Sequence, residues 1–307
     1  MARSPEGFES VRREAECIVR ELDLPPCPAI LARFNEEFNA PRPDLRRLAA
    51  LIATDIGLSA ALIKTVNSAF YGLATKVTGI EQALSVLGLR ASANLVSSLL
   101  LRHAFPDISG PAAEQFWDRS TRIATLAGAI AARIGNINRD EARTYVLFRD
   151  CGMLVMLRKF PQYADLMAQS AKITGAQFMR IEDACFRFNH ARVACALARN
   201  WSLPEPLCAA IFCHHDIGAM PPRPSADAPP DSGLIAFGLL AEQIVALHLN
   251  QGLCPDWPGA ERSVLDALDL QPEGIVALAE DLQGAAAWPC GIPPAARAAP
   301  VQVPREL

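Results

Sequence analysis

The 307-residue chain lacks the features that mark several large classes of protein. It has no run of about 18 apolar residues, which argues against a membrane-spanning helix. Its nine cysteines are odd in number and include no C-x-x-C pair, so neither a disulfide framework nor a zinc ribbon is indicated. The first residues, M-A-R-S-P-E-G, contain no apolar core of the kind that a signal peptide needs. These absences predict a cytoplasmic protein with reduced thiols and no membrane contact.

Common enzyme motifs and strand patterns are also missing. The chain has no glycine-rich phosphate loop and no G-x-S-x-G sequence. Its formal net charge of −4 disfavours a nucleic-acid-binding domain, which usually carries a basic excess. Alternation with period two, which is typical of strands, is scarce, whereas apolar residues recur at helical spacing throughout. With 51% apolar residues, the chain is predicted to be compact and all-α.

Clusters of proline divide the helical pattern into segments. Residues 1–110 predict an N-terminal bundle of short helices, and the proline-containing stretch 106–111 is the expected boundary. Residues 111–287 predict a second helical bundle, interrupted at 218–232 by an insertion with five prolines and almost no bulky apolar residue. Residues 288–307 again contain five prolines and are expected to form a disordered tail.

Single residues predict where helices begin or break. Asp44 and Asn138 have side chains that can cap the helices that follow them. Ser202 and Glu205 have the spacing of a capping box before another helix. Gly152 lies in the middle of a helical stretch, where glycine costs roughly 1 kcal/mol relative to alanine. A break or a close helix contact is therefore expected at this glycine.

The stretch from Leu58 to Leu89 has the clearest helix boundaries in the chain. Its apolar residues predict two helices joined by a short segment. Gly72 is expected to end the first helix in a left-handed conformation. Thr78 and Glu81 have the spacing of a capping box at the start of the second helix, which should stop at Gly88.

The segment between these two helices has two interpretations. In the structural one, the amide of Asn67 satisfies loose backbone groups near the end of a helix. In the functional one, Asn67 forms a recognition surface for a partner or ligand together with Phe70, Tyr71 and Lys76. A helix-turn-helix that binds DNA is disfavoured, because the helix after Gly88 has no basic face.

The sequences N-S-A-F-Y-G at 67–72 and I-E-Q-A-L-S-V-L-G-L at 80–89 resemble the signature of the HDOD family of bacterial signalling domains. The resemblance extends from about Leu24 to about Asn250. It implies two packed helical bundles, of which the second is similar to the HD superfamily of metal phosphohydrolases. It also implies a cytoplasmic regulatory protein that acts by binding partners.

The resemblance to the HD superfamily also points to a set of site residues. These hydrolases hold divalent metals through histidines and an adjacent His-Asp pair on successive helices, because imidazole nitrogen and carboxylate oxygen are good ligands for such ions. Followed along this chain, the pattern falls on Arg119, Arg149, Asp150, His190, His214, His215 and Glu242.

Two of the expected metal ligands are arginines in this chain. The guanidinium groups of Arg119 and Arg149 stay protonated and have no lone pair to offer a metal. The sequence therefore predicts no catalytic residue, no bound metal and no other cofactor. Arg119 and Arg149 are expected to pair with Asp150 or Glu242 and to contribute to partner or ligand binding.

The remaining polar residues of this pattern have two interpretations. In the first, they are hydrogen-bonded side chains of a relic cleft. In the second, they form a partial metal site from Asp150, His190, His214 and His215.

The leading functional prediction is a non-enzymatic signal-transduction or regulatory protein. The resemblance implies other signalling proteins as partners, including members of cyclic-dinucleotide or two-component pathways. No receiver or cyclic-dinucleotide domain fits in the residues outside the resemblance, so the input is expected from another chain or a small ligand. One alternative is a metal-dependent phosphohydrolase acting on nucleotides or cyclic dinucleotides, and a weaker one is a nucleic-acid-binding regulator.

Overall fold

The computed structural model describes residues 17–38, 40–67, 73, 75–135, 137–217, 232–249 and 251–283. Within these ranges all regular secondary structure is helical and no strand occurs, so the prediction of an all-α fold is confirmed. Across the same part of the chain, no helix combines the length and the apolar character that a bilayer crossing needs.

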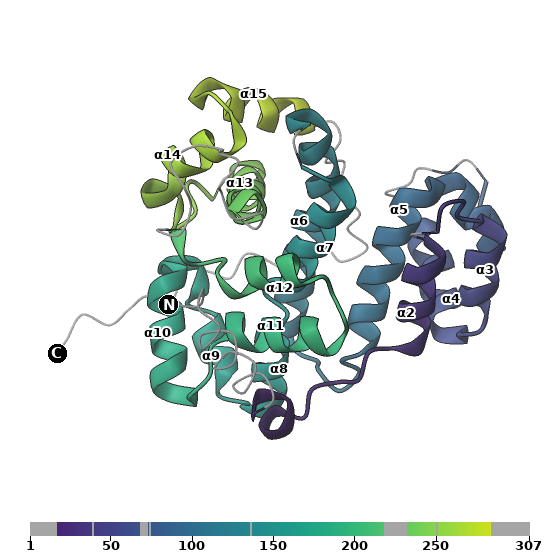
Figure 1. Cartoon of the computed structure of the whole chain (residues 1–307), viewed down its shortest axis with the longest axis horizontal. Helices are drawn as coiled ribbons and strands as arrows, with labels where there is room; N and C mark the ends of the chain where they lie inside the picture. Colours follow the sequence, from purple (N-terminus) through teal and green to yellow (C-terminus); the bar gives the residue numbers. More distant parts are fainter. Residues whose placement is uncertain are drawn as a thin grey trace.

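The helices form two groups, which Figure 1 shows side by side. The first group is drawn in purple and blue. It consists of α2 (Ala29–Phe38), α3 (Leu45–Ala53), α4 (Ile56–Val66) and α5 (Ile80–His103).

The second group is larger and runs from teal to yellow in Figure 1. Buried apolar residues of the two groups belong to one continuous core cluster. The helices of the second group are α6 (Pro111–Ile134), α7 (Arg139–Phe148), α8 (Gly152–Lys159), α9 (Tyr163–Met167), the 3-10 turn η2 (Ser170–Lys172), α10 (Gly175–Phe186), α11 (His190–Asn200), α12 (Glu205–Phe212), α13 (Ser232–His248), α14 (Trp257–Leu268) and α15 (Pro272–Gln283).

Several of the helix caps agree with the sequence prediction. The side chain of Asp44 accepts a hydrogen bond of 2.8 Å from the backbone N–H of Arg46 at the start of α3. Asn138 accepts one of 3.2 Å from the backbone N–H of Glu141 at the start of α7. Local side-chain chemistry is therefore sufficient to place these two helix starts.

Two predicted capping boxes are wrong. Helix α5 begins after Gly79 without a side-chain cap, and Gln82, rather than Glu81, accepts a bond of 3.3 Å from the backbone N–H of Thr78. The helix starts one residue later than predicted, so the residue three positions from its N-cap is Gln82.

The second wrong capping box is the one at Ser202 and Glu205. Ser202 has φ of 56° and donates its backbone N–H to the carbonyl of Arg199, so it closes α11 instead of opening α12. The residue before the first helical position of α12 is Pro204, which has no side-chain donor or acceptor for a cap.

Asn67 is a structural residue at the end of α4. Its side-chain amide donates a hydrogen bond of 2.7 Å to the carbonyl of Val77 and accepts one of 2.8 Å from the N–H of the same residue. It therefore holds the chain that returns toward α5, as the structural interpretation predicted. The predicted helix end at Gly72 is wrong, because α4 ends at Val66 and Asn67 is its C-cap. Phe70, Tyr71 and Gly72 themselves lie outside the described residues, so the recognition role predicted for Phe70 and Tyr71 is untested.

Helix α5 bends at Gly88, where the sequence predicts a stop. The backbone of this residue has φ of 76° and ψ of 165°, a conformation that glycine adopts without a Cβ penalty. Beyond the bend the helix continues to His103. It packs against α3 and α4 of the first group and against α7 of the second, so α5 joins the two groups.

The first described residues, 17–25, lie against the second group. Arg158 of α8 donates hydrogen bonds to the carbonyls of Leu22, at 3.3 Å, and of Asp23. The indole N–H of Trp201 donates one of 2.9 Å to the carbonyl of Pro25. In Figure 1 this segment is the deep-purple helix below α8, from which the chain crosses to α2. The division into folding units near residue 110 stays a prediction.

Candidate functional site

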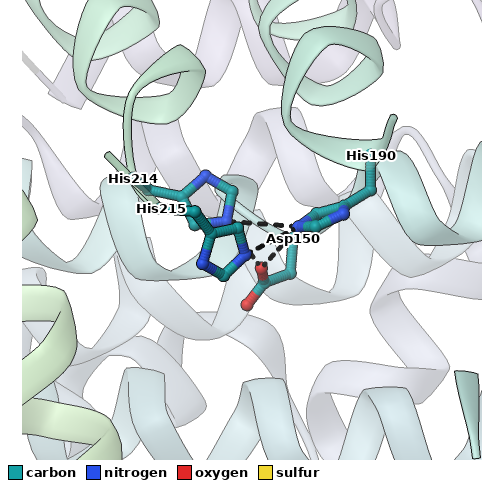
Figure 2. Close-up of side chains that lie close together, drawn as sticks. All are labelled: Asp150, His190, His214 and His215. Carbon is teal, nitrogen blue, oxygen red and sulfur yellow. Dashed lines mark hydrogen bonds and ion pairs between the residues drawn. The ribbon is translucent and has the colours of Figure 1, made fainter. Parts of the chain in front are cut away.

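Four side chains from three places in the second group meet at one point, which Figure 2 shows. Asp150 lies in the turn between α7 and α8, His190 is the first residue of α11, and His214 and His215 follow α12. Their nearest nitrogen and oxygen atoms all lie within 4.8 Å of one another. The structure therefore brings together the four residues of the predicted partial metal site.

The close approach of α8 and α11 places Asp150 beside His190. A Cβ on Gly152, the first residue of α8, would overlap the carbonyl oxygen of His190 and lie 2.7 Å from the backbone nitrogen of Ala194. Only a glycine permits this approach. The predicted break and the predicted close contact at Gly152 are both confirmed.

Hydrogen bonds fix the outer nitrogen of two of the histidine rings. Nδ1 of His214 lies 2.7 Å from the carbonyl oxygen of Ile211, which can only accept, so this nitrogen carries the proton. Nδ1 of His190 lies 2.7 Å from Oε2 of Glu182, and Tyr163 donates its hydroxyl to the other oxygen of that carboxylate. The inner nitrogens, both Nε2, therefore face the centre of the site.

The inner nitrogens lie too close together to be left without a positive partner. Nε2 of His190 lies 3.3 Å from Nε2 of His214 and 3.0 Å from Nε2 of His215. Two lone pairs at such distances repel unless a proton or a cation lies between them. A proton on Nε2 of His190 can be donated to only one of the neighbouring nitrogens at a time. A cation accepts the lone pairs of all three rings.

The pKa directions of these rings reflect their surroundings. Burial lowers the pKa of His190, but the Glu182 and Asp150 carboxylates raise it, and the net shift is upward. Burial and the neighbouring His214 lower the pKa of His215 to about 3, so this ring is neutral at physiological pH. A cation that binds here therefore competes with a proton on His190 and meets a neutral His215.

The donor atoms have the spacing that a single transition-metal ion requires. Ligands about 2.1 Å from a tetrahedral zinc ion lie roughly 3.4 Å apart. In addition to the two ring distances above, Oδ1 of Asp150 lies 3.2 Å from Nε2 of His214 and 3.8 Å from Nε2 of His190. Imidazole and carboxylate ligands suit divalent zinc, iron or manganese. The residues present therefore fit one divalent transition-metal ion.

A cluster of charged residues lies directly beside the four donors. Arg149 forms ion pairs with Glu242 of α13 and, at 3.2 Å, with Asp150, and its side chain is 3% exposed. Arg119 of α6 pairs with the same oxygen of Glu242 at 2.6 Å and is 44% exposed. The ion pairs predicted for the two arginines are present. Glu242 binds arginine and contributes no atom to the four-residue group.

The packing of α13 makes room for the buried guanidinium. A Cβ on Gly238 would lie 2.6 Å from Nη1 of Arg149. Burial raises the pKa of Asp150, but the neighbouring Arg149 and His214 outweigh burial, and the net pKa lies well below its usual range. Asp150 is therefore a carboxylate that faces a guanidinium on one side and the histidines on the other.

Three residues around the site were missed by the sequence prediction. They are Tyr163, Glu182 and Asp256, which support the histidine rings from outside. One signal was present for Glu182, because it lies four residues after Phe178 on the apolar face of α10 and a buried carboxylate needs a partner. Nothing in the local sequence marks Asp256 or Tyr163.

The comparisons with known proteins agree with this architecture. The profile of the HDOD domain family matches residues 24–217. A curated but uncharacterised protein of Treponema pallidum (strain Nichols) is 27% identical over 207 residues. That match covers 65% of this chain but only 39% of the Treponema protein, so the chain spans well under half the length of this relative.

Solved structures show the same fold at low sequence identity. An HDOD domain protein of unknown function from Geobacter sulfurreducens has a TM-score of 0.64 and 24% identity, and covers 90% of this chain and 95% of its own. A Shewanella amazonensis SB2B protein, provisionally named a phosphohydrolase, has a TM-score of 0.64 and 21% identity, with coverage of 88% and 94%. A Marinobacter aquaeolei VT8 protein, provisionally named for signal transduction, has a TM-score of 0.69 and 21% identity, with coverage of 89% and 63%.

Proposed function

The chain belongs to the HDOD domain family, and from this premise we propose that it is a non-enzymatic regulatory module that holds one divalent metal ion in its second helical group. One observation carries the proposal. A complete set of four donors, Asp150, His190, His214 and His215, lies beside a position that Arg119 and Arg149 fill with fixed positive charge.

The arginine cluster argues against metal-dependent hydrolysis. Catalytic metal sites keep an open coordination position for water, or use a second ion close by. Here four protein donors lie within 4.8 Å of one another, the number that a closed tetrahedral site uses. On the neighbouring side, the guanidinium of Arg149 bonds both Asp150 and Glu242, and its charge repels a second cation.

A bound ion would supply a cross-link between segments that are far apart in the sequence. The four donors come from the turn after α7, from the start of α11 and from the turn after α12. Asp150 and the histidines would hold these segments together, and Glu182 and the Ile211 carbonyl fix the direction of two of the rings. The second group would therefore be more rigid with the ion bound than without it. A partner protein can bind the two states with different affinity.

The proposed partners are other signalling proteins. The name of the Marinobacter relative supports a role in signal transduction, and its likeness to this chain is one of fold. The proposal departs from the sequence-based expectation of a metal-free relic cleft. The reason is that the sequence reveals the two arginines but does not reveal how closely the remaining four donors converge.

The test is metal stoichiometry together with activity. Untagged protein loaded with Zn²⁺, Mn²⁺ or Fe²⁺ should retain about one ion per chain by elemental analysis, as a single tetrahedral site requires. His214→Ala should lose the ion, while the exposed control His103→Ala should keep it. The loaded protein should not hydrolyse nucleotides or cyclic dinucleotides.

Two results would overturn the proposal. If wild-type protein binds none of the three ions, the cleft is a relic without a metal. Hydrolysis that is present in the wild type and absent in His214→Ala would instead support a metal-dependent phosphohydrolase. The name of the Shewanella relative favours that second candidate.

A further inference from the structure

His215 is held differently from the other two rings of the site. Its Nδ1 is buried and has no hydrogen-bond partner in the described part of the chain. Its nearest acidic atom is Oδ2 of Asp256, at 3.5 Å, whereas the outer nitrogens of His190 and His214 each have an acceptor at 2.7 Å. Of the three rings, His215 is therefore the one whose Nδ1 faces a carboxylate but lies too far from it for a short hydrogen bond.

Asp256 connects this ring to two other elements. It is the residue directly before α14, and its two carboxylate oxygens accept from the backbone N–H of Gly175 at 3.1 and 3.0 Å. Burial raises the pKa of Asp256, but contact with His215 and the Gly175 N–H lowers it, and the net shift is downward. Asp256 is therefore a carboxylate shared between the start of α10 and the ring of His215.

Gly175 leaves the space that the His215 ring occupies. A Cβ on Gly175 would overlap Nδ1 and two carbons of that ring. The backbone of α10 packs against one side of the ring, and Asp256 faces its outer nitrogen. The ring therefore lies between the start of α10 and the Asp256 carboxylate.

The connection that carries Asp256 is held by side chains of its own. Gln243 of α13 is buried, accepts a hydrogen bond of 2.9 Å from the N–H of Cys254 and donates one of 3.5 Å to the carbonyl of Gly252. Trp257, directly after Asp256, is also buried. All of these residues lie beyond residue 217, where the match to the HDOD profile ends. The carboxylate that faces His215 therefore comes from outside the matched segment, whereas the supports of His190 and His214 lie inside it.

We propose that Asp256 is a positioning residue for His215, and that metal binding at His215 tightens the α13–α14 connection, residues 251–256, onto the start of α10. This inference rests on the metal site proposed above. A ring that gives its Nε2 lone pair to a cation becomes a stronger donor at Nδ1, and Asp256 is the acceptor within reach. Occupancy of the site is thereby transmitted to α14.

Cobalt(II) is the probe for the test, because its visible absorption reports the number and geometry of its ligands. Wild-type protein, Asp256→Asn and the control Asp269→Asn are titrated with Co²⁺. Asp269 is exposed at the other end of α14 and has a left-handed backbone that asparagine tolerates. Asp256→Asn should bind Co²⁺ about 10- to 100-fold more weakly with an altered spectrum, and Asp269→Asn should match the wild type.

Hydrogen exchange supplies a readout that a general loss of stability would not give. In the wild type, Co²⁺ should slow hydrogen exchange at two backbone amides. These are the amide of Gly175, which donates to Asp256, and the amide of Cys254, which donates to Gln243. In Asp256→Asn, Co²⁺ at saturation should leave these two rates unchanged. Protection that is equal in both proteins, together with equal affinity, would overturn the positioning role of Asp256.

The two proposals fail in different ways. If the wild type does not bind Co²⁺, the metal site itself is wrong. If the wild type binds and Asp256→Asn behaves identically, only the role of Asp256 is wrong. If Asp256→Asn does not fold, Gly175→Ala replaces it, with Gly259→Ala as the control, because a Cβ on Gly259 meets open space. Unchanged Co²⁺ affinity in Gly175→Ala would then overturn the inference.

Discussion

At the scale of single residues, the pair of Arg149 and Glu242 places two little-exposed charges directly beside the four donors. The Arg149 side chain is 3% exposed and the Glu242 side chain 11% exposed, so neither charge has full access to water. Such a pair contributes little net stability, because desolvation offsets the attraction between the charges. Removing Glu242 is different, since it leaves the buried Arg149 with Asp150 as its remaining carboxylate partner.

The corresponding prediction concerns Glu242. Glu242→Gln should lower the free energy of unfolding by about 3–5 kcal/mol, because it leaves Arg149 without its main carboxylate. Urea denaturation measures this loss. The control Glu280→Gln, at an exposed position of α15, should change stability by no more than about 0.5 kcal/mol. Equal stability of the two variants would show that Arg149 does not depend on Glu242.

The resemblance to the HD superfamily was enough to find most of the site. The histidines, Asp150 and the two arginines carry a recognisable order along the chain, so sequence alone identified them. Asp256 and Tyr163 could not be found in this way, because their partners lie in other turns of the chain and are chosen by packing. Glu182 had only the weak signal of a carboxylate on the apolar face of α10. The convergence of four donors was also invisible, since it depends on how closely α8 approaches α11.

At the scale of helices, glycines that permit close contacts set the geometry. Gly152 lets the start of α8 lie on the start of α11, and Gly238 lets α13 lie over Arg149. Glycine at such positions was only partly predictable, because sequence shows an unfavourable helix residue without showing what it touches. Caps were predicted well where one side chain acts alone, as at Asp44, and badly where the helix start was misplaced by one residue, as at Thr78.

A matched pair of glycine substitutions tests this account. Gly152→Ala should destabilise the protein by about 1–3 kcal/mol, because its Cβ overlaps backbone atoms of α11 that cannot move aside easily. Gly274→Ala, inside α15 with open space around it, should stabilise by up to about 1 kcal/mol through helix propensity. Thermal and urea unfolding give both values. A stabilising Gly152→Ala would contradict the close contact.

At the scale of the whole molecule, the two helical groups depend on each other. Helix α5 packs on α7, and the segment 17–25 is bound by Arg158 and Trp201. Composition and helical spacing were sufficient to predict an all-α fold. They did not indicate that residues 17–25 lie on one group before the chain crosses to the other, because the bonds that hold 17–25 span more than a hundred residues.

The third prediction follows from this dependence. A fragment of residues 1–108 should not melt as a cooperative, soluble monomer, because it loses the partners of 17–25 and the face of α5 that packs on α7. Circular dichroism during heating and sedimentation of the fragment measure cooperativity and oligomeric state, with the full chain as reference. A sharp transition in a monomeric fragment would show that the first group is self-sufficient.

The path of the chain has a mechanical consequence. Residues 17–25 are hydrogen-bonded to the second group, and the chain re-enters that group at α6. The first group is therefore attached to the second at both of its ends. A helical group attached at one point can rotate in any direction. A group attached at two points rotates mainly about the line that joins them. We expect a shift within the second group to reach the first as a tilt in a restricted direction, and a cut between residue 25 and α2 to remove that restriction.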